Sequence, residues 1–400
     1  MNSPASPPTL ARVSSGTVLV HVDFLLTGIV MTFLGPMLPI LSARWAITDA
    51  AAGRLFLTQF VSSMFGMLAS SSLVERKGYR FTFLVGLLLM AAGMALLGSG
   101  PYWLGVLAVA VLGAGHGVTT PAGNLRTAEI NPQRSASALN VINAVWGVGA
   151  MSSPFLLRAA KALHSPSWFL YGTAVALLVL MAGFMFARFE SDSHVHAPTT
   201  APAPESLWRS KMLPVICVLF FVYVGTEQSF GGWVATYAHR LRPENTSFWT
   251  VMPAFFYGAL LAGRALAPIA LRITRPTTVA ITGLTLAFLG GLALIAAQGM
   301  ALVAVGSSLA GAGLASIFPI SVSLLPRWFG LAARRSSGAV FAGGNMGGAV
   351  LPWVVGVAST YSGSLRLALF VPLLGAAIML AFYVINSRPS AVTAVPESPI

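Results

Sequence analysis

Residues 107–124 read LAVAVLGAGHGVTTPAGN, an apolar stretch with closely spaced glycines and a proline near its end. A related stretch, VGSSLAGAGLASIFP, occupies residues 305–319. Gly113 and Pro121 in the first match Gly311 and Pro319 in the second, at an offset of 198 residues. Glycines allow close contact between helices in lipid, and prolines permit bends. The pattern therefore indicates two equivalent membrane helices in one chain.

Two more pairs of apolar stretches repeat in the same way. The matching residues are Gly149 with Gly347, Pro154 with Pro352, Gly28 with Gly225 and Gly35 with Gly232, at offsets of 197–198. One matching pair would carry little weight, but three pairs at nearly the same offset predict a duplicated bundle. Repeated halves around a site at the membrane midplane are the plan of carriers that work by alternating access.

The composition agrees with a membrane protein. The 400 residues are 56% hydrophobic and 8% charged, with a mean hydropathy of +0.80, whereas soluble domains carry about 25% charged residues. Stretches long enough for a bilayer helix of ~20 residues recur along the chain, without the alternating pattern of a β-barrel. The predicted spans are about 17–41, 51–73, 79–98, 102–126, 136–160, 167–188, 211–238, 248–271, 276–297, 300–325, 336–359 and 365–386.

The sequence thus predicts an all-α integral membrane protein with twelve transmembrane helices in two pseudo-symmetric six-helix bundles. Residues 191–205 read SDSHVHAPTTAPAPE, a composition typical of a flexible linker. We expect an N-terminal bundle over 1–188, a cytoplasmic linker over 189–210, a C-terminal bundle over 211–388 and a disordered tail over 389–400.

The basic residues predict the orientation. Cytoplasmic loops are enriched in Lys and Arg, and fifteen of the 23 fall on the side that holds both termini. We therefore expect cytoplasmic termini in a bacterial-type inner (plasma) membrane, and we see no removable signal peptide. The net charge of +13 follows from this bias and does not indicate nucleic-acid binding.

Enzymatic chemistry has little support. Cys217 is the only cysteine, which excludes an internal disulfide and a cysteine-based metal site. The sequence lacks an HExxH motif, a P-loop and a Ser/His/Asp signature. We expect no enzyme activity, no metal and no cofactor.

The loop between the second and third predicted spans reads SSLVERKGYR over residues 71–80. It resembles the G-x-x-x-D-R-x-G-R-R loop of the major facilitator superfamily, with Ser71 for Gly and Glu75 for Asp. The resemblance implies gating roles for Glu75, Arg76, Gly78 and Arg80. A carboxylate near a helix end can pair with Arg76 or backbone donors in one conformation and release them in the other.

A finer resemblance lies in the seventh predicted span, which reads YVGTE over 223–227 and then GGW over 231–233. It is similar to the fucose/glucose/galactose permease-like (FHS) branch of sugar symporters, with support from Gly263-Arg264 and from IFP over 317–319. Acidic residues of that branch in the first and fourth helices correspond here to Gly35 and to Val118 or Thr120. The resemblance therefore does not imply fucose as the substrate of this chain, nor proton coupling by a pair of acids at these two positions.

Of the ten acidic residues, only Asp23 and Glu227 fall inside predicted spans. A carboxylate at the bilayer centre costs roughly 2.5–3.5 kcal/mol on insertion scales, so one that persists usually faces the bundle interior. We expect Glu227 to bind substrate, carry a proton or do both. Asp23 lies near the inner end of its span, where proton coupling and a gating or structural role are both open.

A sugar needs hydroxyl-binding groups and aromatic rings for its C–H faces. For His116, a site role and a helix-packing role are both open. Arg264 either extends to the interface or pairs with a carboxylate, and Phe318 packs at the bend or lines the cavity. The predicted substrate-binding residues are Glu227, Gln228, Asn143, Trp146, Asn124, His116, Trp233, Tyr257, Asn345 and Trp353.

The sequence predicts a monomeric secondary transporter in the lipid bilayer that moves a small neutral sugar, such as glucose, by proton-coupled symport. Sodium coupling and plain facilitation remain alternatives. A first rival keeps the fold but exports hydrophobic drugs or metabolites by proton antiport. A second rival is a non-transporting membrane receptor, which would leave the repeat and the gate-like loop unexplained.

Overall fold

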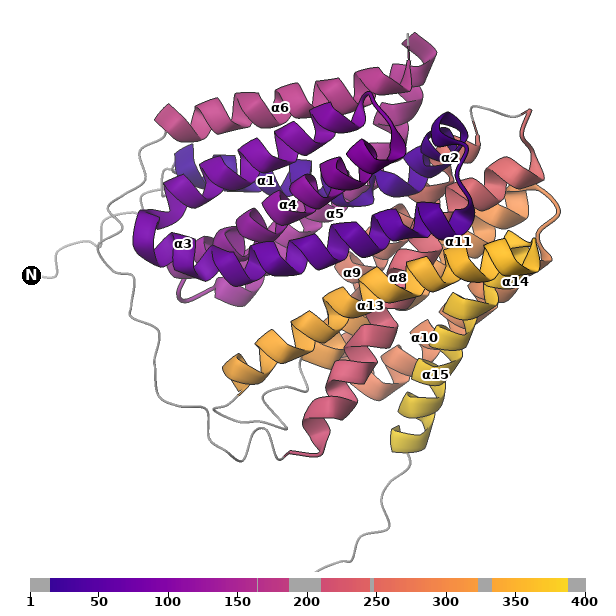
Figure 1. Cartoon of the computed structure of the whole chain (residues 1–400). Coiled ribbons are helices and arrows are strands. Elements are labelled where there is room, and N and C mark those ends of the chain that lie inside the picture. Colours follow the sequence, from indigo (N-terminus) through magenta and orange to yellow (C-terminus); the bar gives the residue numbers. More distant parts are fainter. Residues whose placement is uncertain (1–14, 164, 187–209, 245–247, 323–332, 388–400) are drawn as a thin grey trace, which may run out of the picture. The chain divides into compact units, whose positions relative to one another are not determined.

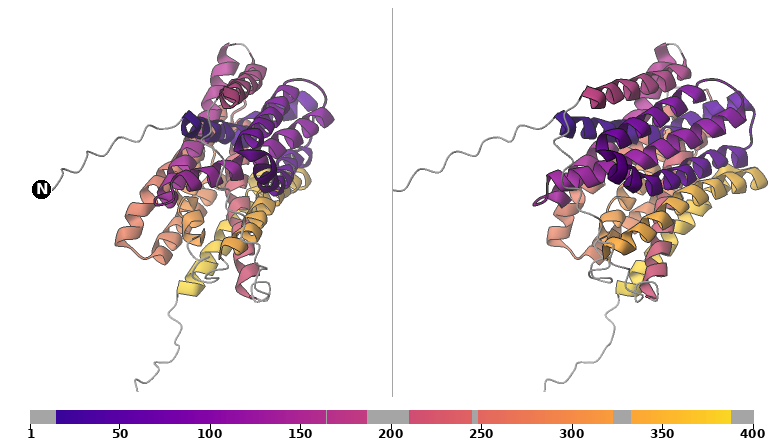
Figure 2. Two further views of the ribbon diagram at one scale, coloured as in Figure 1. Left: turned by 90° about the vertical axis from the view of Figure 1, so that its left-hand side faces the viewer. Right: turned by 60° about the vertical axis from the view of Figure 1, so that its left-hand side comes forward.

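The computed structural model describes residues 15–163, 165–186, 210–244, 248–322 and 333–387. Every secondary-structure element within these ranges is a helix (Figure 1, Figure 2). The predicted linker, apart from Ser210, and the predicted tail lie outside them.

The helices of the first sequence half contain two breaks. The first predicted span is split at Phe33 into two helices that bend by 42°. The second and third spans form one 49-residue element that is broken at Gly78, where φ is 79° and ψ is 170°. Glycine adopts positive φ without the cost of a Cβ clash. The helices are α1 (Ser15–Thr32), α2 (Leu34–Trp45), α3 (Asp49–Leu97), α4 (Tyr102–Ile130), α5 (Ser135–Leu163) and α6 (Pro166–Phe186).

In the second half, α13 lies along α8, and α10 packs on α11 (Figure 1). Two helices, α9 and α10, carry proline at one of their first two positions, where the missing N–H has no intrahelical partner to lose. The elements are α8 (Met212–Leu241), η1 (Trp249–Val251), α9 (Met252–Ile273), α10 (Pro276–Ala296), α11 (Met300–Leu314), α13 (Ala333–Ser362), α14 (Leu365–Ala368) and α15 (Phe370–Ser387).

The described ranges contain nine helices that are long and apolar enough to cross a membrane, or ten with the bent pair α1 and α2. One of the nine, α3, covers two predicted spans, and α5 corresponds to the fifth. The all-helical, multi-pass architecture predicted from the sequence is confirmed.

The repeated glycines make equivalent contacts in the two sequence halves. A Cβ atom built on Gly115 would lie 2.5 Å from the carbonyl oxygen of Gly86, and one on Gly313 would lie 2.4 Å from that of Gly283. Any larger residue would push these helices apart. The repeat in the sequence thus specifies the same close helix approach twice.

The chain divides into two compact units that differ from the sequence halves. The first comprises residues 1–31, 62–149 and 167–198, and the second comprises 32–61, 150–166 and 199–400. The second unit therefore holds α2, the start of α3 and the end of α5 together with the helices of the second sequence half.

Candidate functional site

The second unit contains a buried ion pair between α8 and α9. Arg264 Nη2 lies 3.1 Å from Glu227 Oε2. The side chain of Glu227 is 7% exposed and that of Arg264 is 27% exposed. A charge of either sign is costly to bury alone, so the pair lets both groups remain ionised inside the helix bundle. Of the two alternatives for Arg264, the structure selects pairing with a carboxylate.

A tyrosine completes this cluster. Tyr223 lies one turn before Glu227 on α8, and its hydroxyl donates to Glu227 Oε2. The same hydroxyl accepts from Arg264 Nη2 at 3.2 Å. Tyr257 of α9 is also buried. Its hydroxyl oxygen packs against α8 at Gly231, one turn after Glu227, so closely that a Cβ atom built on Gly231 would lie 2.5 Å from it. We call Tyr223, Glu227, Tyr257 and Arg264 the α8–α9 cluster.

The α8–α9 cluster presents both donors and acceptors at no net charge. Arg264 Nε is buried and has no hydrogen-bond partner within the described part of the chain. A buried guanidinium donor that is left unpaired costs free energy, which a ligand oxygen would recover. The cluster can therefore bind a polar, uncharged group.

Aromatic rings adjoin the cluster. The ring of Phe318 lies 6.2 Å from that of Tyr223 and is stacked on Phe341 at a centroid distance of 6.1 Å. Phe220 contacts both phenylalanines edge-on. Phe341 is 39% exposed, so the group has an accessible aromatic side.

Among the other predicted residues of the second unit, Trp233 and Asn345 donate hydrogen bonds to the backbone. Trp233 is fully buried and donates from its indole nitrogen to Pro352 O at 2.9 Å. Asn345 Nδ2 donates to Phe341 O within its own helix at 3.0 Å. Gln228 is buried next to Glu227, and Trp353 is half-buried. Their substrate-binding roles stay predictions.

In the first unit, His116 bridges two hydroxyl groups. Its Nδ1 lies 3.1 Å from Ser63 Oγ, and its Nε2 lies 3.1 Å from Thr120 Oγ1. Both ring nitrogens therefore have partners between α3 and α4. Ser63 was not singled out from the sequence, because a serine in an apolar span carries little signal by itself.

Asp23 is completely buried on α1, and neither carboxylate oxygen has a hydrogen-bond partner among the described residues. Asn124 is half-buried, and its Oδ1 is likewise unpartnered there. Asn143 is exposed and donates to Leu139 O at 2.7 Å, and Trp146 is half-buried. The site roles predicted for these residues remain predictions.

The predicted gating loop surrounds the break in α3. Gly78 supplies the positive φ at which the helix changes direction. Glu75, Arg76 and Arg80 are exposed, and Arg80 Nε donates to Phe184 O at 3.0 Å. The loop therefore contacts the end of α6, and its gating role remains a prediction.

Comparisons with known proteins agree on the family. A family model described as Major Facilitator Superfamily matches residues 24–272. The chain is 22% identical over 356 residues to the glucose/mannose transporter GlcP of Bacillus subtilis, covering 85% of this chain and 87% of that protein.

Two solved structures have a similar fold. The nucleoside transporter NupG matches with a TM-score of 0.77 at 10% identity, covering 94% of this chain and 98% of that chain. The fucose:proton symporter FucP of E. coli matches with a TM-score of 0.60 at 18% identity, covering 93% and 98%.

Proposed function

The chain belongs to the Major Facilitator Superfamily, and we propose that this secondary transporter carries a small neutral sugar, such as a hexose, by proton-coupled symport. The observation that carries the proposal is the α8–α9 cluster. Its paired charges cancel, which suits an uncharged substrate, and its groups can both donate to and accept from sugar hydroxyls.

The rings next to the cluster support the same substrate class. A sugar has polar edges and apolar C–H faces, and Phe318 and Phe341 offer a flat apolar surface beside Tyr223. The relative GlcP is named for glucose and mannose, and FucP for fucose and protons. A wholly apolar cavity, as an exporter of hydrophobic compounds would need, does not fit the ion pair.

We propose different roles for the two buried carboxylates. Glu227 has its charge balanced by Arg264 and acts as a substrate ligand. Asp23 has no such partner within the described ranges, and an isolated buried carboxylate is costly unless it takes up a proton. Asp23 is therefore the proposed proton carrier, which binds and releases its proton as the protein changes conformation.

The first test is counterflow of labelled glucose into proteoliposomes that are preloaded with candidate sugars. Glu227→Gln should lower exchange about 10- to 100-fold, because a hydrogen bond to a charged group contributes roughly 1.5–3 kcal/mol. Glu244→Gln is the matched control, since that carboxylate is 67% exposed and should leave exchange unchanged.

Two results would count against the sugar. Folded protein that exchanges no hexose would exclude this substrate class, and competition by hydrophobic cations would indicate the exporter instead. Folded protein without flux of any kind would favour a receptor.

The coupling proposal has its own test. Asp23→Asn should abolish accumulation driven by a pH gradient while counterflow continues, because exchange of loaded forms needs no net proton movement. Accumulation that persists in Asp23→Asn would exclude this residue as the proton carrier. Accumulation driven by a sodium gradient would identify sodium, and not the proton, as the coupling ion.

We further propose that both termini are cytoplasmic in an inner membrane of bacterial type, that the two six-helix halves are joined by the linker at 189–210, and that the carrier is monomeric. The bias of Lys and Arg toward one side supports this orientation. Protease digestion of termini in right-side-out and inverted vesicles checks it, with cleavage expected only in the inverted ones.

A further inference from the structure

The start of α3 and the second part of α13 pack closely within the second unit. A Cβ atom on Gly53 would lie 3.0 Å from Trp353 Cα, and one on Gly348 would lie 2.7 Å from the ring of Phe60. Residue numbers rise along α3 as they fall along α13, so the two segments run in opposite directions. Glycine at these positions lets the helices approach closely.

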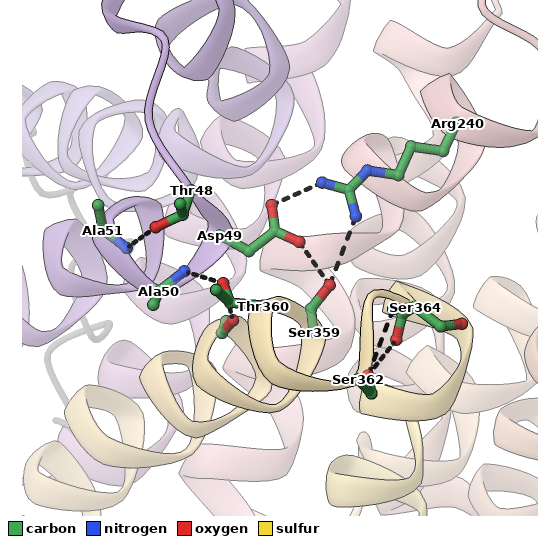
Figure 3. A network of polar contacts seen from close by, with 10 residues as sticks. Thr48, Asp49, Ala50, Ala51, Arg240, Ser359, Thr360, Ser362 and Ser364 are labelled. Atoms are coloured by element: carbon green, nitrogen blue, oxygen red, sulfur yellow. Dashed lines mark hydrogen bonds and ion pairs between the residues drawn. The ribbon is translucent and has the colours of Figure 1, made fainter.

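A polar cluster lies at one end of this contact, where α8 also ends. Arg240 Nη2 lies 2.6 Å from Asp49 Oδ1. Ser359 Oγ donates to Asp49 Oδ2 and accepts from Arg240 Nη1 at 3.4 Å (Figure 3). Asp49 thus has both carboxylate oxygens bound by groups from α8 and α13.

The backbone of α3 also depends on α13. Ala50 N–H donates to Thr360 Oγ1 at 2.8 Å, and that hydroxyl donates to Gly356 O at 3.0 Å (Figure 3). The first N–H groups of a helix have no partner inside it. A side chain from the other half of the sequence therefore satisfies the start of α3. We call Asp49, Arg240, Ser359 and Thr360 the α3–α13 latch.

We propose that the α3–α13 latch is a gate that must open in every transport cycle. The inference rests on the proposed alternating access, in which the halves of the sequence move against each other. Asp49 belongs to the first half, whereas Arg240, Ser359 and Thr360 belong to the second. The orientation predicted from the basic residues places this gate on the outer side, where it controls access of external substrate.

The chemistry of the latch suits a contact that opens and closes. The Asp49 side chain is 9% exposed, but that of Arg240 is 46% exposed. A partly exposed ion pair contributes little net stability, because water solvates the separated charges nearly as well. Water can likewise accept the hydrogen bonds of the N–H groups at the start of α3 in place of Thr360. Opening the latch therefore leaves no buried group unpaired.

The closing experiment joins the two sides of the latch covalently. In a Cys217→Ser background, Ala50→Cys and Thr360→Cys are combined and oxidised. A disulfide should stop counterflow, and reduction should restore it, while each single variant should tolerate the oxidant. Unchanged counterflow in protein whose disulfide is demonstrated by mass spectrometry would overturn the proposal.

A second measurement requires no substrate and is therefore independent of the sugar assignment. Phe56 is buried against Trp233 beneath the latch. Asp49→Asn should make Phe56→Cys react several-fold faster with a membrane-impermeant maleimide added outside. Glu244→Gln is the matched control and should leave the labelling rate unchanged. Equal rates with and without Asp49→Asn would exclude the latch as a gate, even if hexose transport had failed.

Discussion

Two carboxylate–arginine pairs on α8 have the same local design but connect different parts of the chain. Glu227 pairs with Arg264 of α9, from the same sequence half, and Tyr223 bridges the two charges. Arg240 pairs with Asp49 of α3, from the other half. Ser359 bridges this second pair in the same way, donating to the carboxylate and accepting from the guanidinium.

The surroundings separate the two pairs. The arginine of the α8–α9 cluster is 27% exposed, whereas that of the latch is 46% exposed. Breaking the first pair leaves charges in the bundle interior, which is costly. When the second pair breaks, water solvates the half-exposed Arg240, although Asp49 is nearly as buried as Glu227. A pair within one half can persist through the transport cycle, while a pair between halves has to be weak enough to open.

The largest expected difference comes from removing each arginine. Arg264→Leu leaves Glu227 buried and unpaired, which should destabilise the protein by about 3–5 kcal/mol. Arg240→Leu should cost less, because the guanidinium that is lost is already 46% exposed to water and contributes less net stability. Thermal unfolding of the purified variants in detergent measures both. Equal losses would mean that burial does not distinguish the pairs.

A smaller difference is expected for the bridging hydroxyls. Tyr223→Phe removes hydrogen bonds to two buried charges and should cost roughly 1.5–3 kcal/mol, with lower sugar exchange. Ser359→Ala should change the melting temperature less and instead speed the labelling of Phe56→Cys. The comparison would fail if Ser359→Ala slowed labelling or if Tyr223→Phe left exchange intact.

Salt should produce the smallest effect. The Debye length falls from ~10 Å at 0.1 M to ~3 Å at 1 M, which screens exposed charges much more than buried ones. Raising the external salt concentration should therefore speed the labelling of Phe56→Cys when the latch is intact. With Asp49→Asn already present, added salt should change the rate little. If salt speeds labelling equally in the protein with an intact latch and in Asp49→Asn, the salt effect does not arise from the latch.

The sequence predicted the parts of the site that depend on one residue and its depth in the membrane. Glu227 is buried because its position in a long apolar span leaves no route to water. The matching contacts of Gly115 and Gly313 follow from the repeat, since small residues at equal positions permit the same helix approach.

Other parts of the site could not be predicted this way. Arg264 had two open alternatives, because the rotation of α9 about its axis decides whether it meets Glu227 or the membrane surface. Asp49 lies outside the predicted spans, and nothing near it in the sequence indicates that contacts with α8 and α13 bury it. The substrate-binding role of Trp233 stays a prediction, but the hydrogen bond from its indole nitrogen to Pro352 O could not be foreseen from the sequence.

The sequence alone determined the class of the protein, its all-helical multi-pass architecture and the two acids within the predicted spans. These follow from local physics, because a segment of about 20 apolar residues must satisfy its own backbone hydrogen bonds to enter a bilayer. Only the tertiary structure decided which charges meet. Pairing depends on how helix faces are turned toward each other, and residues far apart in the chain, such as Asp49 and Arg240, carry no sequence signal of that contact.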